Sequence, residues 1–202
     1  SFDDFYFDPK NFGLKKNLLE EGDDLFLYGI KKSGKSFLLQ SVCNFYASKN
    51  KSSLYIPIAE VMKYGISFMD SLDNLDVICI DDIDLINSNK EWEIAIFNLI
   101  NDCLISKCRL IFSSSFNPSS IKFDLKDLIS RIKKMDHVEL FPVSEDKLND
   151  ALNFICNLRS INLGEKEINY LVTYSKRNIS DLINIINKLD KTSMQLKRKI
   201  TI

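Results

Sequence analysis

The segment Gly29–Ser36 constrains the fold of this chain more than any other, because it fills every fixed position of the phosphate-loop pattern G-x-x-x-x-G-K-[S/T]. A strand-like apolar run, residues 25–28, precedes it, and a helix-like run, residues 37–46, follows it. The glycines let the backbone turn tightly enough to aim N–H groups at a phosphate, and the helix N-terminus adds partial positive charge. An ordinary Gly/Ser turn before a helix is the alternative, but the strand–loop–helix context favours a nucleoside triphosphate site.

Within this loop the residue types suggest distinct roles. Lys35 is placed to reach the β- and γ-phosphates, and the Ser36 hydroxyl to bind Mg²⁺. We expect the whole loop and the residue after it to contact the nucleotide: Gly29, Ile30, Lys31, Lys32, Ser33, Gly34, Lys35, Ser36 and Phe37.

A second motif supports the first. The apolar run at residues 77–80 ends in two carboxylates, Asp81 and Asp82. Near-continuous apolar runs are typical of strands buried in parallel sheets, and ligands bind at the carboxyl ends of such strands. We predict that Asp81 holds Mg²⁺ through its water shell and that Asp82 orients or deprotonates the attacking water. A solvated strand end is the alternative, which the upstream phosphate loop makes less favourable.

The segment Asn187–Asp190 matches N-K-x-D, the guanine-binding signature of GTPases. In GTPases this signature closes an apolar strand, whereas here apolar residues recur at helical spacing across residues 178–192. The D-x-x-G of GTPases is also missing after the second motif. We interpret the match as chance, so adenine is the expected base.

Composition excludes some classes of function. The chain has 202 residues, 45% hydrophobic and 27% charged, with a formal net charge of −1, so no global field draws it to nucleic acid or membrane. Its five cysteines form no C-x-x-C pair, which favours a reduced, cytoplasmic protein. No signal peptide and no bilayer-spanning apolar run is found, so we expect no membrane association.

Strand-like and helix-like runs alternate over the first two-thirds of the chain, which predicts an α/β fold with a parallel sheet between helices. Strands are expected at residues 25–28, 54–58, 77–80, 109–114 and 137–141. Ser144 then opens a helical tail with three apolar stripes. This order is the AAA+ layout, and we predict a P-loop nucleotide-binding core at residues 1–142 and a three-helix lid at residues 143–202.

Three further segments resemble the bacterial DnaA family of AAA+ proteins: the start F-x-x-F-x-x-x-P-x-N at residues 2–11, the sensor 1 strand at residues 109–118, and D-L-x-S-R at residues 127–131. The resemblance implies that Asp8, Pro9 and Asn11 lie beside the adenine, that Ser114 of sensor 1 contacts the nucleotide, and that Arg131 is an arginine finger. Without the resemblance, Arg131 beside Lys133 and Lys134 would be interpreted as a surface arginine.

Within that family, W-E-x-A-I-F-x-L-x-N at residues 92–101 and the tail at residues 189–202 resemble the Hda regulators. This resemblance implies ATP or ADP with Mg²⁺ as cofactors, slow turnover completed by a partner subunit, and a DnaA-type initiator and the DNA polymerase sliding clamp as partners; it leaves a homodimer open. The family's sensor 2 arginine falls at Ser180, and Arg177 is the nearby candidate for contact with the nucleotide.

Direct DNA binding is disfavoured. The initiator inserts a helical element between its second and third strands for single-stranded DNA, but here the interval at residues 59–76 is short, with Lys63 its sole basic residue. The expected function is therefore regulation of replication initiation. The ATPase core of a DnaA-type initiator and a helicase-loader ATPase are the alternatives.

Overall fold

The computed structural model describes residues 1–20, 22–175, 178–196 and 200. Its contacts divide the chain into two compact units, which are described separately. The core unit comprises Ser1–Phe2 and Gly13–Leu140, and the helical unit comprises Asp3–Phe12 with the chain from Phe141 onward. The assignment of nucleotide-binding and lid functions to either side of residue 142 stays a prediction.

The core unit is built on a five-stranded sheet in the order β2-β3-β4-β1-β5. Every neighbouring pair is parallel, which confirms the sheet type expected from the alternation. The central strands β3 and β4 are buried at every position, and the apolar run at residues 77–80 predicts this for β3. The strand bounds are β1 Leu25–Tyr28, β2 Ser53–Pro57, β3 Val77–Asp81, β4 Arg109–Ser114 and β5 Asp136–Glu139.

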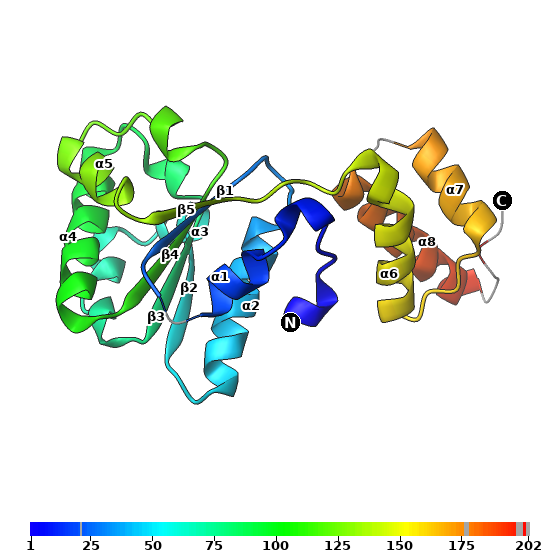
Figure 1. Ribbon diagram of the computed structural model, residues 1–202, viewed down its shortest axis with the longest axis horizontal. Helices are drawn as coiled ribbons and strands as arrows, with labels where there is room; N and C mark the ends of the chain where they lie inside the picture. The colour runs from blue at the N-terminus through cyan, green and yellow to red at the C-terminus, as the bar shows by residue number, and fades with distance from the viewer. Residues whose placement is uncertain (21, 176–177, 197–199, 201–202) are drawn as a thin grey trace. The chain divides into compact units, whose positions relative to one another are not determined.

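Helices cover both faces of this sheet. Figure 1 shows α1 and α2 on one side of the strands and α4 and α5 on the other, which is the predicted three-layer α/β arrangement. The short helix α3 follows β2. The helix bounds are α1 Leu14–Leu19, α2 Lys35–Ser48, α3 Ile58–Val61, α4 Lys90–Ser106 and α5 Lys126–Ile132.

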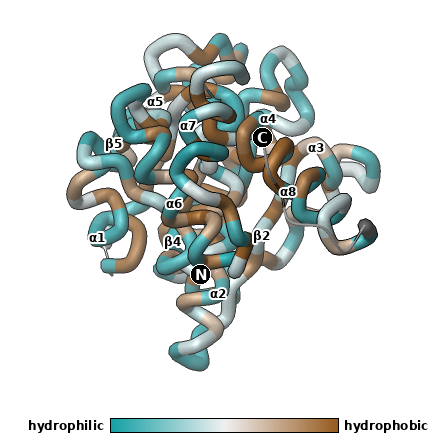
Figure 2. Tube along the Cα trace, turned by 90° about the vertical axis from the view of Figure 1, so that its right-hand side faces the viewer, coloured by the Kyte–Doolittle hydropathy of each residue, from teal (hydrophilic) through white to brown (hydrophobic). Residues whose placement is uncertain are grey.

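The core between the layers is apolar and interlocked. Trp92, Ile96 and Ile100 on one face of α4 are buried against the sheet. Phe26 of β1 and Phe112 of β4 meet edge to face, with ring centroids 6.5 Å apart. Figure 2 shows that the turn after α2 is hydrophilic. Each such buried side chain stabilises the fold by about 1.5–3 kcal/mol, so this packing fixes the strand ends that carry the motifs.

The helical unit contains α6 Leu148–Leu158, α7 Glu165–Tyr174 and α8 Ile179–Leu196. Their apolar stripes meet in one cluster, which confirms the three stripes in the sequence. The helical tail begins after Ser144 with a 3₁₀ turn at residues 145–147, which leads into α6. The side chain of Asn178 accepts hydrogen bonds from the N–H groups of Ser180 and Asp181 and so caps α8.

The N-K-x-D match lies within α8, which confirms that it is not a strand-end guanine signature. In the described ranges 1–20, 22–175 and 178–196, no helix combines the length and apolarity needed to cross a bilayer.

Candidate nucleotide-binding site

The phosphate loop runs from the end of β1 to the start of α2, as the motif requires. The Gly29 N–H donates to the Ser114 carbonyl at 3.2 Å. A Cβ on Gly29 would lie 2.5 Å from the Leu140 carbonyl oxygen, so a larger residue does not fit. Gly34 has φ 104° and caps α2 in the left-handed region, which favours glycine. Both fixed glycines of the motif are therefore required by the backbone.

The polar groups of the loop are arranged to receive an anion. Lys35 is buried, and its Nζ donates to the carbonyls of Gly29 at 2.8 Å and Ile30 at 3.0 Å. The Ser33 hydroxyl is also buried and has no hydrogen-bond partner among the described residues. The N–H groups of Lys35 and Ser36, in the first turn of α2, have no acceptor within the helix. An orphaned hydroxyl and free helix donors fit a phosphate group.

The charge of Lys35 is shaped by its surroundings. Burial lowers the pKa of Lys35, and the carboxylates of Asp82, Asp81 and Asp84 act in the opposite direction. A phosphate would add further negative charge beside the ammonium and favour its protonated form.

Asp81, the predicted metal ligand, is held by two hydroxyl groups. Tyr55 OH donates to Asp81 Oδ2 at 2.6 Å, and Ser113 Oγ donates to Asp81 Oδ1. The Tyr55 phenol also interacts with the side chains of Gln40 and Ser36. The structure thus brings Ser36 and Asp81, the two predicted magnesium ligands, around one phenol.

No group of three or more His, Cys, Asp or Glu side chains in the described ranges could hold a metal ion by itself. Mg²⁺ binds readily through one carboxylate together with substrate phosphates and water. The pair Ser36 and Asp81 fits such a shared site, in which the nucleotide completes the coordination.

Asp82, the predicted catalytic carboxylate, follows β3 in the left-handed region with φ 55°. Its N–H donates to Ser113 Oγ at 2.9 Å, which links it to the Asp81 network. Burial raises the pKa of Asp82, and Asp81 and Asp84 raise it further. A raised pKa makes a carboxylate a better proton acceptor, which suits the role predicted for Asp82.

The two serines that end β4 have different partners. Ser114, the predicted sensor 1 contact, is buried, and its hydroxyl accepts from the Phe116 N–H at 2.9 Å. Ser113 contacts Asp81 instead. The sequence motifs did not identify Ser113 or Tyr55 as site residues. For Ser113 the reason is that two adjacent serines give no indication of which one contacts the neighbouring strand.

Arg131, the predicted finger, lies near the end of α5. It is half-buried, and its guanidinium forms no hydrogen bond or ion pair within the described part of the chain. The buried Glu93 carboxylate fixes the entry to α5, accepting from the N–H groups of Asp124 at 3.2 Å and Leu125 at 2.7 Å. The N–H of Ser88 also donates to Glu93 at 3.2 Å. A well-anchored helix therefore presents an uncommitted arginine.

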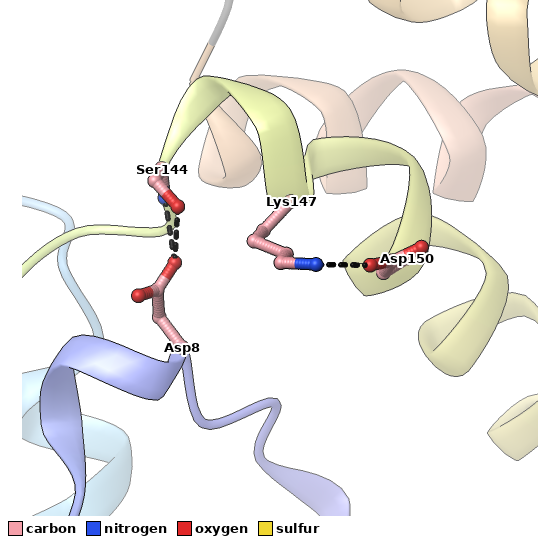
Figure 3. A network of polar contacts seen from close by, with 4 residues as sticks. All are labelled: Asp8, Ser144, Lys147 and Asp150. Carbon is pink, nitrogen blue, oxygen red and sulfur yellow. Dashed lines mark hydrogen bonds and ion pairs between the residues drawn. The ribbon is translucent and has the colours of Figure 1, made fainter.

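The residues predicted beside the adenine lie in the helical unit. Asp8 is buried and caps the 3₁₀ turn η2 (Pro9–Asn11) by accepting from the Lys10 N–H, while its other oxygen accepts from Ser144 N at 2.8 Å and Ser144 Oγ at 2.6 Å (Figure 3). Burial alone would raise the pKa of Asp8, but these hydrogen bonds outweigh it and lower the pKa.

Asn11 pairs with the backbone of Phe141 in both directions, each at 2.9 Å. This pairing explains why β5 ends at Glu139 and not at the predicted Phe141, since the Phe141 backbone bonds to a side chain. Arg177, the remaining candidate, lies outside the described residues.

Comparison with known proteins agrees with this geometry. The model of the bacterial DnaA ATPase domain matches residues 14–136, more than half of the chain. The chain belongs to this DnaA ATPase family. A second model, the Hda lid domain, matches residues 145–202.

Relatives and solved structures extend the match over the whole chain. An uncharacterized protein from Haemophilus influenzae is 29% identical and covers 100% of this chain and 90% of its own length. Domain III of the Thermotoga maritima replication initiation protein DnaA has a TM-score of 0.85 at 20% identity, covering 100% of this chain and 91% of that one. AMPPCP-bound DnaA from Aquifex aeolicus has a TM-score of 0.75 at 20% identity, covering 92% of this chain and 63% of that one. At this identity the structures show the fold, and the family models show a DnaA/Hda-like AAA+ protein.

Proposed function

We propose that this protein is a nucleotide-binding AAA+ regulator of replication initiation, which stimulates hydrolysis of ATP held by a DnaA-type initiator. The observation that carries the proposal is the combination of a DnaA ATPase core and an Hda-type lid in one chain. The sequence resemblance at residues 92–101 and 127–131 supports the same assignment.

In this proposal Arg131 acts in trans. A finger supplies positive charge where the transition state of phosphoryl transfer spreads negative charge over the phosphate oxygens. The guanidinium is suited to this role because the described part of the chain does not neutralise it, and because Glu93 anchors the helix that carries it.

The protein's own site would hold ATP or ADP. The loop N–H groups, the Ser33 hydroxyl and Lys35 would bind the phosphates, and Ser36 with Asp81 would hold Mg²⁺. The bound metal ion would neutralise phosphate charge. Asp82 would orient or deprotonate the attacking water. Asp8, Pro9, Asn11, Ser114 and Arg177 remain the candidates for contacts with the rest of the nucleotide. We propose that turnover at this site is slow until a partner subunit completes it.

The proposed partners are the initiator and the DNA-loaded sliding clamp, with a homodimer as a further assembly. Direct binding to DNA is expected to be weak, because the net charge is −1 and the interval between β2 and β3 is short of basic residues. A protein acting on a chromosomal initiator is expected in the cytoplasm.

The test is phosphate release from ATP-loaded initiator in the presence of DNA-loaded clamp, with and without this protein. We expect stimulation by the nucleotide-loaded wild type and its loss, about 10³-fold or more, in Arg131→Ala, because fingers contribute rate factors of that order. Lys133→Ala is the matched control, since it removes a neighbouring exposed cation and should retain stimulation within about twofold.

Absence of stimulation by the folded, nucleotide-loaded protein would contradict the proposal. The initiator-core and helicase-loader hypotheses would then be favoured. Equal stimulation by Arg131→Ala and wild type would show that Arg131 is not an arginine finger, and the proposed regulatory role would still stand.

A further inference from the structure

Tyr55 occupies a position that the nucleotide-site motifs do not account for. It lies on β2, next to β3 in the sheet, with Tyr55 opposite Cys79 and Pro57 opposite Asp81. Its side chain reaches along the sheet edge, so that the hydroxyl lies 2.6 Å from Asp81 Oδ2. The same phenol interacts with Ser36 and Gln40 on α2. Tyr55 therefore joins three elements at the point where the two motifs meet.

The hydrogen bond to Asp81 is of the strong kind. A hydroxyl that donates to a carboxylate at 2.5–2.7 Å forms a charge-assisted bond, about twice as strong as a neutral one. With Ser113 donating to the other oxygen, the Asp81 carboxylate is fixed at both oxygens and cannot rotate freely. Carboxylates that bind metals are commonly oriented by such outer hydrogen bonds, whose removal lowers metal affinity about 10- to 100-fold.

We propose that Tyr55 is a positioning residue for the magnesium site, holding the Asp81 carboxylate toward Ser36 so that the metal–nucleotide complex binds more tightly than the free nucleotide. This inference rests on the proposed nucleotide-binding function. The ring of Tyr55 is half-buried on β2, so its burial contributes to stability, and the positioning role belongs to the hydroxyl alone.

Tyr55→Phe separates these two contributions, because it keeps the ring and removes only the hydroxyl. The matched control is Tyr28→Phe. Tyr28 lies at the carboxyl end of β1 in the same sheet, and its hydroxyl contacts the exposed Glu139 at 3.5 Å, remote from Asp81 in the hydrogen-bond network.

The experiment measures the affinity of the full chain for a fluorescent ADP analogue, first in EDTA and then across a Mg²⁺ titration. For Tyr55→Phe we expect unchanged affinity in EDTA and a Mg²⁺ concentration for half-maximal tightening raised about 10-fold. Tyr28→Phe should match wild type in both series. In an Asp81→Asn background, Tyr55→Phe should have no further effect on the Mg²⁺ dependence, since the two changes act through one contact.

Equal loss of affinity in EDTA and in Mg²⁺ would assign Tyr55 a structural role and overturn the inference, as would an unchanged Mg²⁺ dependence. If wild type binds no nucleotide under either condition, the proposed function fails first, and the inference falls with it. These outcomes are distinct, because only the last one requires the wild-type protein itself to bind no nucleotide.

Discussion

Two regions rich in motif residues use their polar groups in opposite ways. Among the described residues, the buried Ser33 hydroxyl of the phosphate loop has no partner, and Lys35 Nζ donates only to carbonyls of its own loop. In the N-terminal clamp, which we define as Asp8 and Asn11 with their partners Phe141 and Ser144, the side-chain oxygens of Asp8 and Asn11 all accept hydrogen bonds, and the Ser144 hydroxyl donates one. The loop residues, and Asp8 and Asn11 of the clamp, were predicted to contact the nucleotide.

This difference separates polar groups that stabilise the fold by pairing within the protein from polar groups that are left for a ligand. A buried polar group without a partner costs about 1–3 kcal/mol, so a chain that leaves Ser33 unpaired gives up stability at that point. The clamp recovers such costs by pairing its groups internally. We therefore expect changes in the loop to alter ligand binding, and changes in the clamp to alter stability.

Of the changes in these two regions, Lys35→Met has the largest expected effect, on nucleotide affinity. Charge-assisted hydrogen bonds contribute about 1.5–3 kcal/mol, so loss of the ammonium should weaken ADP binding about 10- to 100-fold. Stability of the free protein should not fall, because burial already disfavours the charged form of Lys35. Titration of fluorescent ADP and thermal unfolding of the same samples measure the two quantities. If Lys35→Met binds ADP normally but unfolds at a lower temperature than wild type, the loop contributes to stability and not to binding, contrary to this expectation.

The clamp should show the opposite response. Asp8→Ala removes the acceptor for the N–H groups of Lys10 and Ser144 and for the Ser144 hydroxyl, and we expect the opening free energy of α6 to fall by about 2 kcal/mol. Amide hydrogen exchange of α6 measures it.

Asp150→Ala is the control for this variant. Asp150 forms an exposed ion pair with Lys147 at 3.2 Å (Figure 3), and such pairs contribute about 0–1 kcal/mol. If Asp8→Ala and Asp150→Ala lower the opening free energy of α6 by the same amount, the burial of Asp8 adds nothing to its contribution. The clamp would then be an ordinary surface contact.

Much of the core unit could be predicted from sequence because its signals are local. A continuous apolar run such as residues 77–80 identifies a buried strand, and the fixed glycines identify the loop that follows β1. The loop lies between β1 and α2, and Asp81 ends β3, as the motifs predict, while their binding of a nucleotide stays a prediction. The order of strands in the sheet is not local, since it depends on which runs pack side by side.

This non-local part explains what the sequence missed. Tyr55 lies beside Asp81 only because β2 pairs with β3, and nothing in residues 53–57 indicates that pairing. Likewise the motif at residues 2–11 indicated a nucleotide contact but not that Asp8 and Asn11 pair with residues 141–144, which are distant in sequence. Motifs identify residue types, and the pairing of distant segments determines their partners.

The smallest expected effect is the pH dependence of the clamp, and it tests whether Asp8 acts as a carboxylate. The hydrogen bonds to Asp8 lower its pKa in the folded state, so the folded protein holds the proton less tightly than the unfolded chain. The stabilisation is then fully present above about pH 4, the ordinary carboxyl pKa, and is lost as the pH falls through the folded value.

Asp8→Asn keeps the shape of the side chain but cannot ionise, so its α6 opening free energy should lie below that of wild type by about 1 kcal/mol at neutral pH, and the gap should close on acidification. Unfolding in urea, followed by helical circular dichroism at neutral and acid pH, extends the hydrogen-exchange measurement into the range where exchange is slow. A gap that stays constant or widens in acid would mean that the Asp8 charge contributes nothing. The clamp would then be stabilised by hydrogen-bond geometry alone, which would sharpen its contrast with the charged phosphate loop.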